Sequence, residues 1–287
     1  MSYALTEAGA NGGQAQRQFP PKSVLERVFA LLDCFTDKEP ELTLAELVVR
    51  TGIPKSTVHR LAGVLVERRL LKRTGTGFAL GLGLFELGEL AEDLRTLRDA
   101  SLPSLEELFE QTHETIHLGV LDGGEVLYFV KIVSYRAFPL PTRTGGRWPV
   151  HASALGKVLL AFDGSDRSRS LLQPDLKALT RYTITDPNRL SLELARARRD
   201  GVAYESEESV LGNACVAAPI FNSAGHPAAA VSVAGPAVRL RAEQRASIVR
   251  RAAAHITARI GGRLPNGWRL LLLGCDQCLR VRSSGFE

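Results

Sequence analysis

The chain has 287 residues, of which 45% are hydrophobic and 23% charged, so it can bury about two ordinary domain cores and long disorder is excluded. Its net charge of +5 permits nucleic-acid binding without specifying it. No run approaches the roughly 18 consecutive apolar residues of a membrane span, and no basic-then-apolar leader opens the chain, which together favour a cytoplasmic protein.

Residues 1–21 are rich in Ala, Gly and Gln and carry few large apolar side chains, which predicts a mobile arm. The apolar side chains that follow recur at helical spacing and predict a first helix: Val24, Val28, Leu31, Leu32 and Phe35. We expect this helix to pack behind the two that come next, so that residues 22–81 form one small domain.

Residues 43–65 have the features of a helix-turn-helix. Thr43 can cap a helix whose third residue, Glu46, bonds back to it. Gly52 ends that helix, and Pro54 can occupy the first position of the next, where its missing N–H costs nothing. The turn between the two helices is therefore short.

The second of these helices has an apolar face and a polar face. At about 100° per residue, Val58, Leu61 and Leu65 fall within roughly 60° of one another. The opposite face carries Ser56, His59, Arg60 and Gly63. We interpret the polar face as one that contacts DNA. Gly63 costs up to about 1 kcal/mol relative to Ala in a helix, and either a close approach of DNA or a close helix crossing would explain it.

Seven Lys or Arg residues lie in residues 50–73 against one acid, Glu67. Such a run is usually a solvated face, but here it coincides with the helix-turn-helix, where phosphates would lie. Residues 72–80 then predict two short strands around a glycine-containing turn, which is a wing. The predicted DNA-binding residues are Thr43, Lys55, Ser56, Thr57, His59, Arg60, Lys72, Arg73 and Thr76.

Apolar residues keep a three/four spacing from Leu84 to Leu97, which predicts a linker helix over residues 82–100. This stripe can pair with its twin from another subunit or pack on its own chain, and the spacing fits both alternatives. Because one winged helix reads only a few base pairs, we expect a homodimer, with pairing into a tetramer as a further step, on a palindromic or repeated operator.

Residues 101–263 alternate between helices and strands in an order typical of an α+β domain with an antiparallel sheet covered by helices. Helices are expected at 102–109, 154–162, 192–199 and 241–260, and strands at 116–120, 126–133, 202–204, 215–221 and 227–234. The glycines at 123–124 and at 225 mark the two hairpin turns. Residues 264–287 form a tail, in which the run 270–273 is expected to dock.

Several motifs, in this order, resemble the IclR family of bacterial transcriptional regulators. They are residues 53–61 in the helix-turn-helix, 149–157 before a helix, 201–220, and 232–236. The resemblance covers about residues 23–263. It implies an amino-terminal winged helix-turn-helix domain followed by a carboxy-terminal GAF-like domain that binds an effector.

The resemblance also implies the lining of the effector pocket: Trp148, Ala154, Leu155, Glu205, Asn213, Cys215, Ser232 and Ala234. Strand alternation agrees, since residues two apart project to one side of a strand. Ordinary core packing would explain Cys215 and Ala234 equally well. Asn213 and Ser232 are more informative, because a buried amide or hydroxyl requires a partner and a ligand can supply it.

Relatives that sense glyoxylate or pyruvate have a serine in place of Ala234 and an acid shorter than Glu205. These departures, together with Trp148, favour a larger effector that is aromatic or otherwise partly apolar over a small 2-oxo acid. We expect an aromatic or other organic acid.

Ser153, His151 and Asp163 have the composition of a nucleophilic site. His151 and Ser153 are only two residues apart in the segment that the resemblance assigns to the effector loop, and no nucleophile turn surrounds them. Catalysis is therefore not expected. The alternative hypothesis is an enzyme or a redox switch that acts through Cys215.

Two pairs of residues have the spacing of metal ligands. His113 and His117 lie four apart, but the residues beside His117 predict a strand, so we interpret both as structural or surface histidines. Cys275 and Cys278 form a lone CxxC, which cannot complete a four-ligand zinc site. The four cysteines of the chain are scattered and predict no disulfide framework. The sequence thus predicts no metal and no cofactor.

The sequence as a whole predicts a DNA-binding repressor or activator rather than an enzyme. Its expected partners are a double-stranded DNA operator, a small-molecule effector and a second copy of the chain, with no membrane.

Overall fold

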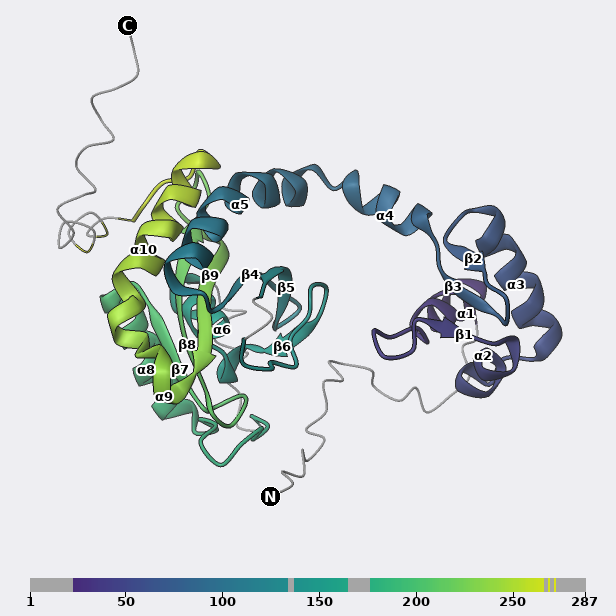
Figure 1. Ribbon diagram of the computed structural model, residues 1–287, viewed down its shortest axis with the longest axis horizontal. Coiled ribbons are helices and arrows are strands. Elements are labelled where there is room, and N and C mark those ends of the chain that lie inside the picture. The colour runs from purple at the N-terminus through teal and green to yellow at the C-terminus, as the bar shows by residue number, and fades with distance from the viewer. Residues whose placement is uncertain (1–22, 134–136, 165–175, 266–267, 269–270, 272–287) are drawn as a thin grey trace, which may run out of the picture. The chain divides into compact units, whose positions relative to one another are not determined.

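The computed structural model describes residues 23–133, 137–164, 176–265, 268 and 271 (Figure 1). They belong to two compact units, the first ending at Arg95 and the second beginning at Thr96. The predicted arm over residues 1–21 and the CxxC at Cys275 and Cys278 lie outside the described residues. Among the described helices, none is long and apolar enough to cross a membrane.

The first unit is a small helical domain with a three-stranded antiparallel sheet in the order β1-β3-β2 (Figure 1). Its elements are α1 (Val24–Leu32), β1 (Glu41–Leu42), α2 (Leu44–Thr51), α3 (Lys55–Glu67), β2 (Leu71–Arg73), β3 (Phe78–Leu80) and α4 (Leu82–Glu89). The core joins Leu31, Leu47 and Val58 to Leu71 and Phe78 of the strands. The helix-turn-helix and the wing are thus held by one apolar cluster.

The caps of α2 and α3 explain the sharp turn between them. Thr43 and Glu46 form the expected reciprocal cap, and Gly52 ends α2 in the left-handed region at φ 66°. Pro54 precedes α3 rather than forming its first residue, so that expectation was wrong by one position. Its backbone is extended, yet its carbonyl accepts the N–H of Thr57 and of Val58, which is how a residue that caps a helix behaves.

The single linker helix expected over residues 82–100 is two helices. α4 stops at Glu89, and α5 (Glu92–Thr112) runs on past residue 101, where the second domain was expected to begin. Gly88 lies two residues before the interruption, and glycine has the poorest helix propensity after proline. The division between the two compact units falls within α5.

The second unit is built on a six-stranded antiparallel sheet in the order β6-β5-β4-β9-β8-β7 (Figure 1). The strands are β4 (Thr115–Asp122), β5 (Glu125–Ile132), β6 (Arg147–Pro149), β7 (Ala203–Ser206), β8 (Asn213–Phe221) and β9 (Pro227–Pro236). The helices that follow α5 are η1 (Val150–Ala152), α6 (Ala154–Phe162), α8 (Pro187–Asp200), α9 (Ala237–Leu240) and α10 (Ala242–Arg259). The expected antiparallel α+β architecture is confirmed.

Helices cover both faces of this sheet. On one face α5 and α10 pack on Val216 and Ala218 of β8, whereas on the other face α6 and α8 pack on Cys215 and Ala217. Every residue of β8 is therefore buried, which explains why this strand is apolar at almost every position rather than at alternate ones. The α6 face is the one that carries the candidate site.

Part of the predicted tail docks on the second unit. Trp268 is buried, and its ring meets the rings of Phe162 and Phe221 edge-on, with centroids 6.2 and 5.3 Å away. Leu271 packs against the same cluster and is the described member of the leucine run that we expected to dock.

Candidate functional site

The polar face of α3 is free, as its periodicity predicts. Val58, Leu61 and Leu65 are buried, whereas Ser56, His59 and Arg60 are exposed, as is Lys55. Among the described residues, these four exposed side chains make no hydrogen bond or ion pair. A Cβ placed on Gly63 would meet nothing within 4 Å, so no close helix crossing in the described part of the chain accounts for that glycine.

The other residues predicted to bind DNA differ in how accessible they are. Lys72 and Arg73 are exposed on β2, and the Arg73 guanidinium lies over the ring of Phe78 with 5.4 Å to its centroid. The hydroxyls of Thr43 and Thr76 are already engaged, with Glu46 and with Glu41 respectively. Thr57 is half-buried on α3. Of the residues predicted to bind DNA, those on the exposed face of α3 and the two cations of β2 are thus the accessible ones.

A cavity lies in the second unit, on the α6 face of the sheet. Its lining consists of His117, Tyr128, Leu140, Thr142, Trp148, Ser153, Ala154, Leu155, Glu205, Ser209, Val210, Asn213, Cys215, Ser232 and Ala234. All eight residues predicted for the effector pocket are among them. The open space is about 20 Å³, room for roughly one or two water molecules.

Cross-strand register explains why these side chains converge. Glu205 of β7 pairs with Cys215 of β8, and Cys215 pairs with Ala234 of β9, so the three side chains form one row on one face of the sheet. One step along the sheet, Ser232 of β9 pairs with His117 of β4. The helix α6 then closes the space above both rows.

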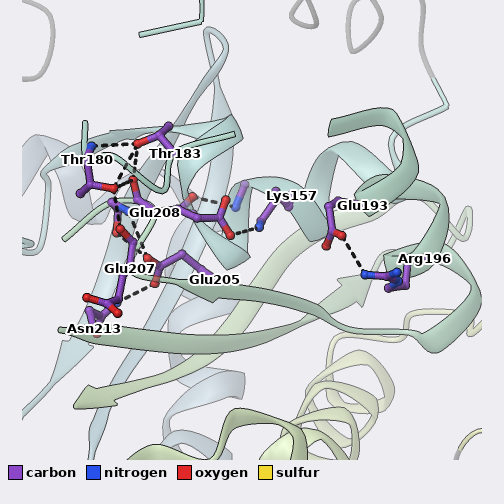
Figure 2. A network of polar contacts seen from close by, with 12 residues as sticks. Lys157, Thr180, Thr183, Glu193, Arg196, Glu205, Glu207, Glu208 and Asn213 are labelled. Atoms are coloured by element: carbon purple, nitrogen blue, oxygen red, sulfur yellow. Dashed lines mark hydrogen bonds and ion pairs between the residues drawn. The ribbon is translucent and has the colours of Figure 1, made fainter. Parts of the chain in front are cut away.

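Glu205 and Asn213 form the polar end of the cavity (Figure 2). Asn213 Nδ2 donates to Glu205 Oε2 at 2.6 Å, and Glu205 Oε1 accepts from the N–H and the hydroxyl of Ser209. Burial raises the pKa of Glu205 to about 7. Among the described residues, the buried Asn213 Oδ1 has no hydrogen-bond partner, and the Ser232 hydroxyl has only the thiol of Cys215 beside it.

A buried ion pair holds the loop that carries this polar end (Figure 2). Lys157 of α6 is only 1% exposed, and its Nζ lies 2.6 Å from Glu208 Oε1. The hydroxyls of Thr180 and Thr183 donate to the main-chain carbonyls of Glu207 and Glu208, both at 2.6 Å. The loop between β7 and β8 is thus tied to α6 and to the segment before α8.

His117, which was expected to be a structural or surface histidine, is buried and structural, and it lies in the cavity wall. Its Nε2 lies 2.9 Å from Thr142 Oγ1, and its ring packs on Tyr128 at 4.8 Å between centroids. Burial lowers the pKa of His117 to about 3, so the ring is neutral. Lys131 donates to the Thr142 carbonyl at 2.6 Å and fixes the same segment from outside.

Sequence reasoning missed seven residues of the lining: His117, Tyr128, Leu140, Thr142, Ser153, Ser209 and Val210. Strand alternation offers a signal for His117, since it projects to the same face of β4 as Thr115, the partner of Ala234. Leu140 and Thr142 lie in the connection between β5 and β6, where no periodicity marks them. No local signal could have found those two.

The side chains that resembled a nucleophilic site serve as structural groups. Ser153 Oγ accepts the N–H of Gly156 and donates to the Pro149 carbonyl, which caps α6. His151 Nε2 lies 3.0 Å from the Lys177 carbonyl rather than beside a nucleophile. Burial raises the pKa of the Cys215 thiol, so it is not a reactive thiolate. The described residues contain no group of three or more side chains that could hold a metal ion.

Both units match domains of known proteins. Residues 24–75 match the IclR helix-turn-helix domain, and residues 92–258 match the carboxy-terminal domain of bacterial IclR transcriptional regulators. The chain is 35% identical to the transcriptional regulator KipR of Bacillus subtilis, over 81% of this chain and 94% of KipR. It is 31% identical to the transcriptional repressor IclR of Escherichia coli, over 83% and 90% of the two chains.

A solved structure agrees. The IclR homologue of Microbacterium hydrocarbonoxydans, crystallised with 4-hydroxybenzoate, superposes with a TM-score of 0.79 at 31% identity, covering 83% of this chain and 99% of the homologue. Together the matched domains and the relatives show that the chain belongs to the IclR family of transcriptional regulators.

Proposed function

We propose that this regulator binds its operator through the exposed face of α3 and the wing cations, acts in the cytoplasm, and is controlled by an organic acid that binds in the cavity. The observation that carries the proposal is the cavity itself. All eight side chains predicted for an effector pocket line it, and one of them, Asn213, presents a buried polar atom with no partner among the described residues. A ligand can satisfy such atoms, whereas an apolar core cannot.

The start of α6 supports an acid as the ligand. Ala154 and Leu155 are the first two residues of α6 and line the cavity. The first N–H groups of a helix have no intrahelical partner, and the helix dipole favours negative charge there. The rings of Tyr128 and Trp148 in the wall favour an aromatic or otherwise apolar body. The similar structure that holds 4-hydroxybenzoate supports the same class.

The size of the cavity implies how the effector acts. A space of about 20 Å³ is far too small for an organic acid of this kind, so an effector binds only to an arrangement in which the wall has opened. A ligand that binds one arrangement of the protein better than another shifts the population towards the arrangement that it binds. If the two arrangements differ in affinity for the operator, the ligand therefore changes operator binding. We propose that the wall opens at Leu140 and Thr142, which belong to no helix or strand and are held through Thr142 by His117 and Lys131.

A thermal-melting screen tests the effector. Aromatic and aliphatic carboxylic acids are added to the full-length protein beside amines and sugars of similar size as controls. An acid present at 100 times its Kd stabilises the protein by roughly 2.7 kcal/mol, which raises the melting temperature. The acids that do so should also change affinity for an operator selected from random duplexes. The proposal fails if no acid moves either quantity.

We further propose that the regulator is a homodimer, with a tetramer as a further step. The apolar stripe of Leu84 to Leu97 was expected to pair with the same stripe of another subunit or to pack on its own chain. Its last residue, Leu97, packs in the core of its own chain. Large apolar side chains remain exposed on α4 and the start of α5: Leu82, Phe85, Leu87, Leu90 and Leu94. Light scattering should give at least a dimer at micromolar concentration, and Phe85→Lys with Leu90→Lys should weaken both the dimer and operator binding. A monomeric wild type would contradict the proposal.

We infer that the effector is not turned over. The matched relatives are transcriptional regulators, and the buried Cys215 thiol gives no support to the redox alternative. An acid that stabilises the protein should be recovered chemically unchanged after long incubation, as chromatography and mass spectrometry would show. Iodoacetamide should leave the ligand response intact, and conversion of the acid to a product would overturn this inference.

A further inference from the structure

The amide of Asn213 is fixed in one orientation. Its nitrogen faces Glu205, to which it donates at 2.6 Å, and Glu205 Oε1 is occupied by two donors from Ser209. Turning the amide over would place Asn213 Oδ1 against a carboxylate oxygen, so that two acceptors would meet. The atom left over is therefore the amide oxygen. The residue is 3% exposed, and among the described residues Oδ1 has no donor.

A second polar group of the lining, the Ser232 hydroxyl, lies farther along the same cavity. In the register of β8 and β9, Asn213 pairs with Pro236, Cys215 with Ala234, and Ala217 with Ser232. At about 3.4 Å per residue, Asn213 and Ser232 are thus separated by roughly 14 Å along the direction of the strands. Cys215 and Ala234 lie between them and make the middle of this wall apolar. From Asn213 to Ser232, this wall of the cavity is therefore polar at one end, apolar in the middle and polar again at the other end.

Resting on the proposed function, in which the effector is an organic acid, we propose that this acid also carries a hydroxyl group, which donates its proton to Asn213 Oδ1. An acceptor that is buried and unpaired selects for a ligand with an O–H or N–H group at that point. A neutral hydroxyl fits better than an ammonium group. Both oxygens of Glu205 already accept hydrogen bonds, and Asn213 Oδ1 offers a single acceptor, which one hydroxyl satisfies and the three N–H groups of an ammonium do not. Asn213 is thus the residue that determines specificity for the hydroxyl.

Calorimetry on the full-length protein tests the proposal with matched acids. 4-Hydroxybenzoate is compared with 4-fluorobenzoate, in which fluorine of similar size donates no proton, and with 4-(aminomethyl)benzoate, which carries an ammonium group in place of the hydroxyl. The 3-substituted isomers and the corresponding phenylacetates vary the distance between the carboxylate and the substituent. The titrations are made at pH 8, above the pKa of about 7 to which burial raises Glu205, so that its carboxylate holds the amide in the observed orientation.

The hydroxyl compound should bind at least about tenfold more tightly than its fluoro analogue. In Asn213→Leu that preference should disappear while the fluoro acid still binds. Leu211→Ala, an exposed position in the same loop, should keep the preference, and melting curves should show that both variants are folded.

The outcomes separate this inference from the function on which it rests. Equal affinity for hydroxyl and fluoro acids in the wild type, or an undiminished preference in Asn213→Leu, would overturn the hydroxyl proposal and leave the acid effector in place. Tighter binding of the aminomethyl compound would replace the hydroxyl by a cation. If no acid of any length binds, both the effector class and the hydroxyl proposal are wrong.

Discussion

The polar side chains of α3 and those of the cavity wall differ in what holds them. Ser56, His59 and Arg60 are exposed and make no bond within the described part of the chain, whereas Glu205 and Asn213 are buried and bonded to each other. A substitution on α3 removes contacts to a partner and little else. A substitution in the cavity wall also leaves a neighbour buried without its own partner. Folding stability and ligand affinity are therefore separable in the first unit and coupled in the second.

The ion pair beside the cavity offers the sharpest test of that difference. Lys157→Met would leave Glu208 buried without its cation, and Glu208 Oε2 already lacks a partner among the described residues. Removing one member of a buried pair costs about 3–5 kcal/mol, so the second unit should lose that much free energy of unfolding. Both tryptophans of the chain, Trp148 and Trp268, lie in this unit, so denaturation followed by tryptophan fluorescence reports on it alone.

The double variant is the control for this prediction. Lys157→Met combined with Glu208→Leu removes both charges and should recover most of the lost stability, because an apolar pair can replace a buried ion pair at little cost. If Lys157→Met alone is as stable as the wild type, the loop does not depend on the pair and the contrast between the two units weakens.

Glu205 should make the stability of the second unit depend on pH. Burial raises its pKa from 4.5 in the unfolded chain to about 7 in the fold. Between these values the folded state keeps a proton that the unfolded state has lost. The contribution of Glu205 is therefore fully present below pH 4.5 and falls as pH rises through about 7, by up to about 1.4 kcal/mol per pH unit.

Glu205→Gln cannot titrate and isolates this effect from that of other groups. Urea denaturation of the wild type and the variant from pH 4.5 to 8 should show a difference in unfolding free energy that changes steadily up to about pH 7 and then levels off. A constant difference across the whole range would mean that Glu205 is ionised in the fold.

Arg60→Ala should affect binding and not folding. If Arg60 contacts a guanine edge, its loss costs about 1–3 kcal/mol in operator affinity and relaxes discrimination at one base pair. The unfolding free energy should change by less than about 0.5 kcal/mol, because the side chain is exposed and unpaired. Fluorescence anisotropy across operators substituted at each position would measure both. Wild-type affinity in this variant would refute the assignment of α3 as the reading helix.

The same contrast explains what could be predicted from the sequence. The two faces of α3 follow from a local period, so Val58 and Leu61 on one side and Arg60 on the other could be assigned from spacing alone. The eight cavity residues came from a resemblance, and alternation along β8 and β9 agreed with it. His117 and Thr142 were missed because their place beside Ser232 depends on which strands pair and on the connection between β5 and β6.

The predicted boundaries of helices and strands were wrong where local patterns do not determine them. The apolar spacing of residues 84–97 continues through the interruption at Leu90, so periodicity alone could not show that α4 and α5 are separate helices. The three-residue strand β6 exists because Trp148 pairs with Val126 of β5, a contact that a propensity over three residues cannot reveal.

The smallest expected effect concerns the wing. Lys72 is exposed on β2 and interacts with the exposed Glu41 only through charge, as the least of the causes that lower the pKa of Glu41, so Lys72→Ala should leave the fold unchanged. If its ammonium group neutralises one phosphate, the slope of log affinity against log salt should become shallower by about 0.9, and all duplexes should lose affinity alike. Lys72 is a better choice than Arg73, because the guanidinium of Arg73 also contacts Phe78.

The matched control is Lys38→Ala. Lys38 is exposed and lies outside the helix-turn-helix and the wing, so this variant should keep the wild-type slope. Anisotropy titrations at several salt concentrations measure the slopes, and a loss restricted to one sequence would show that Lys72 contacts a base rather than the backbone.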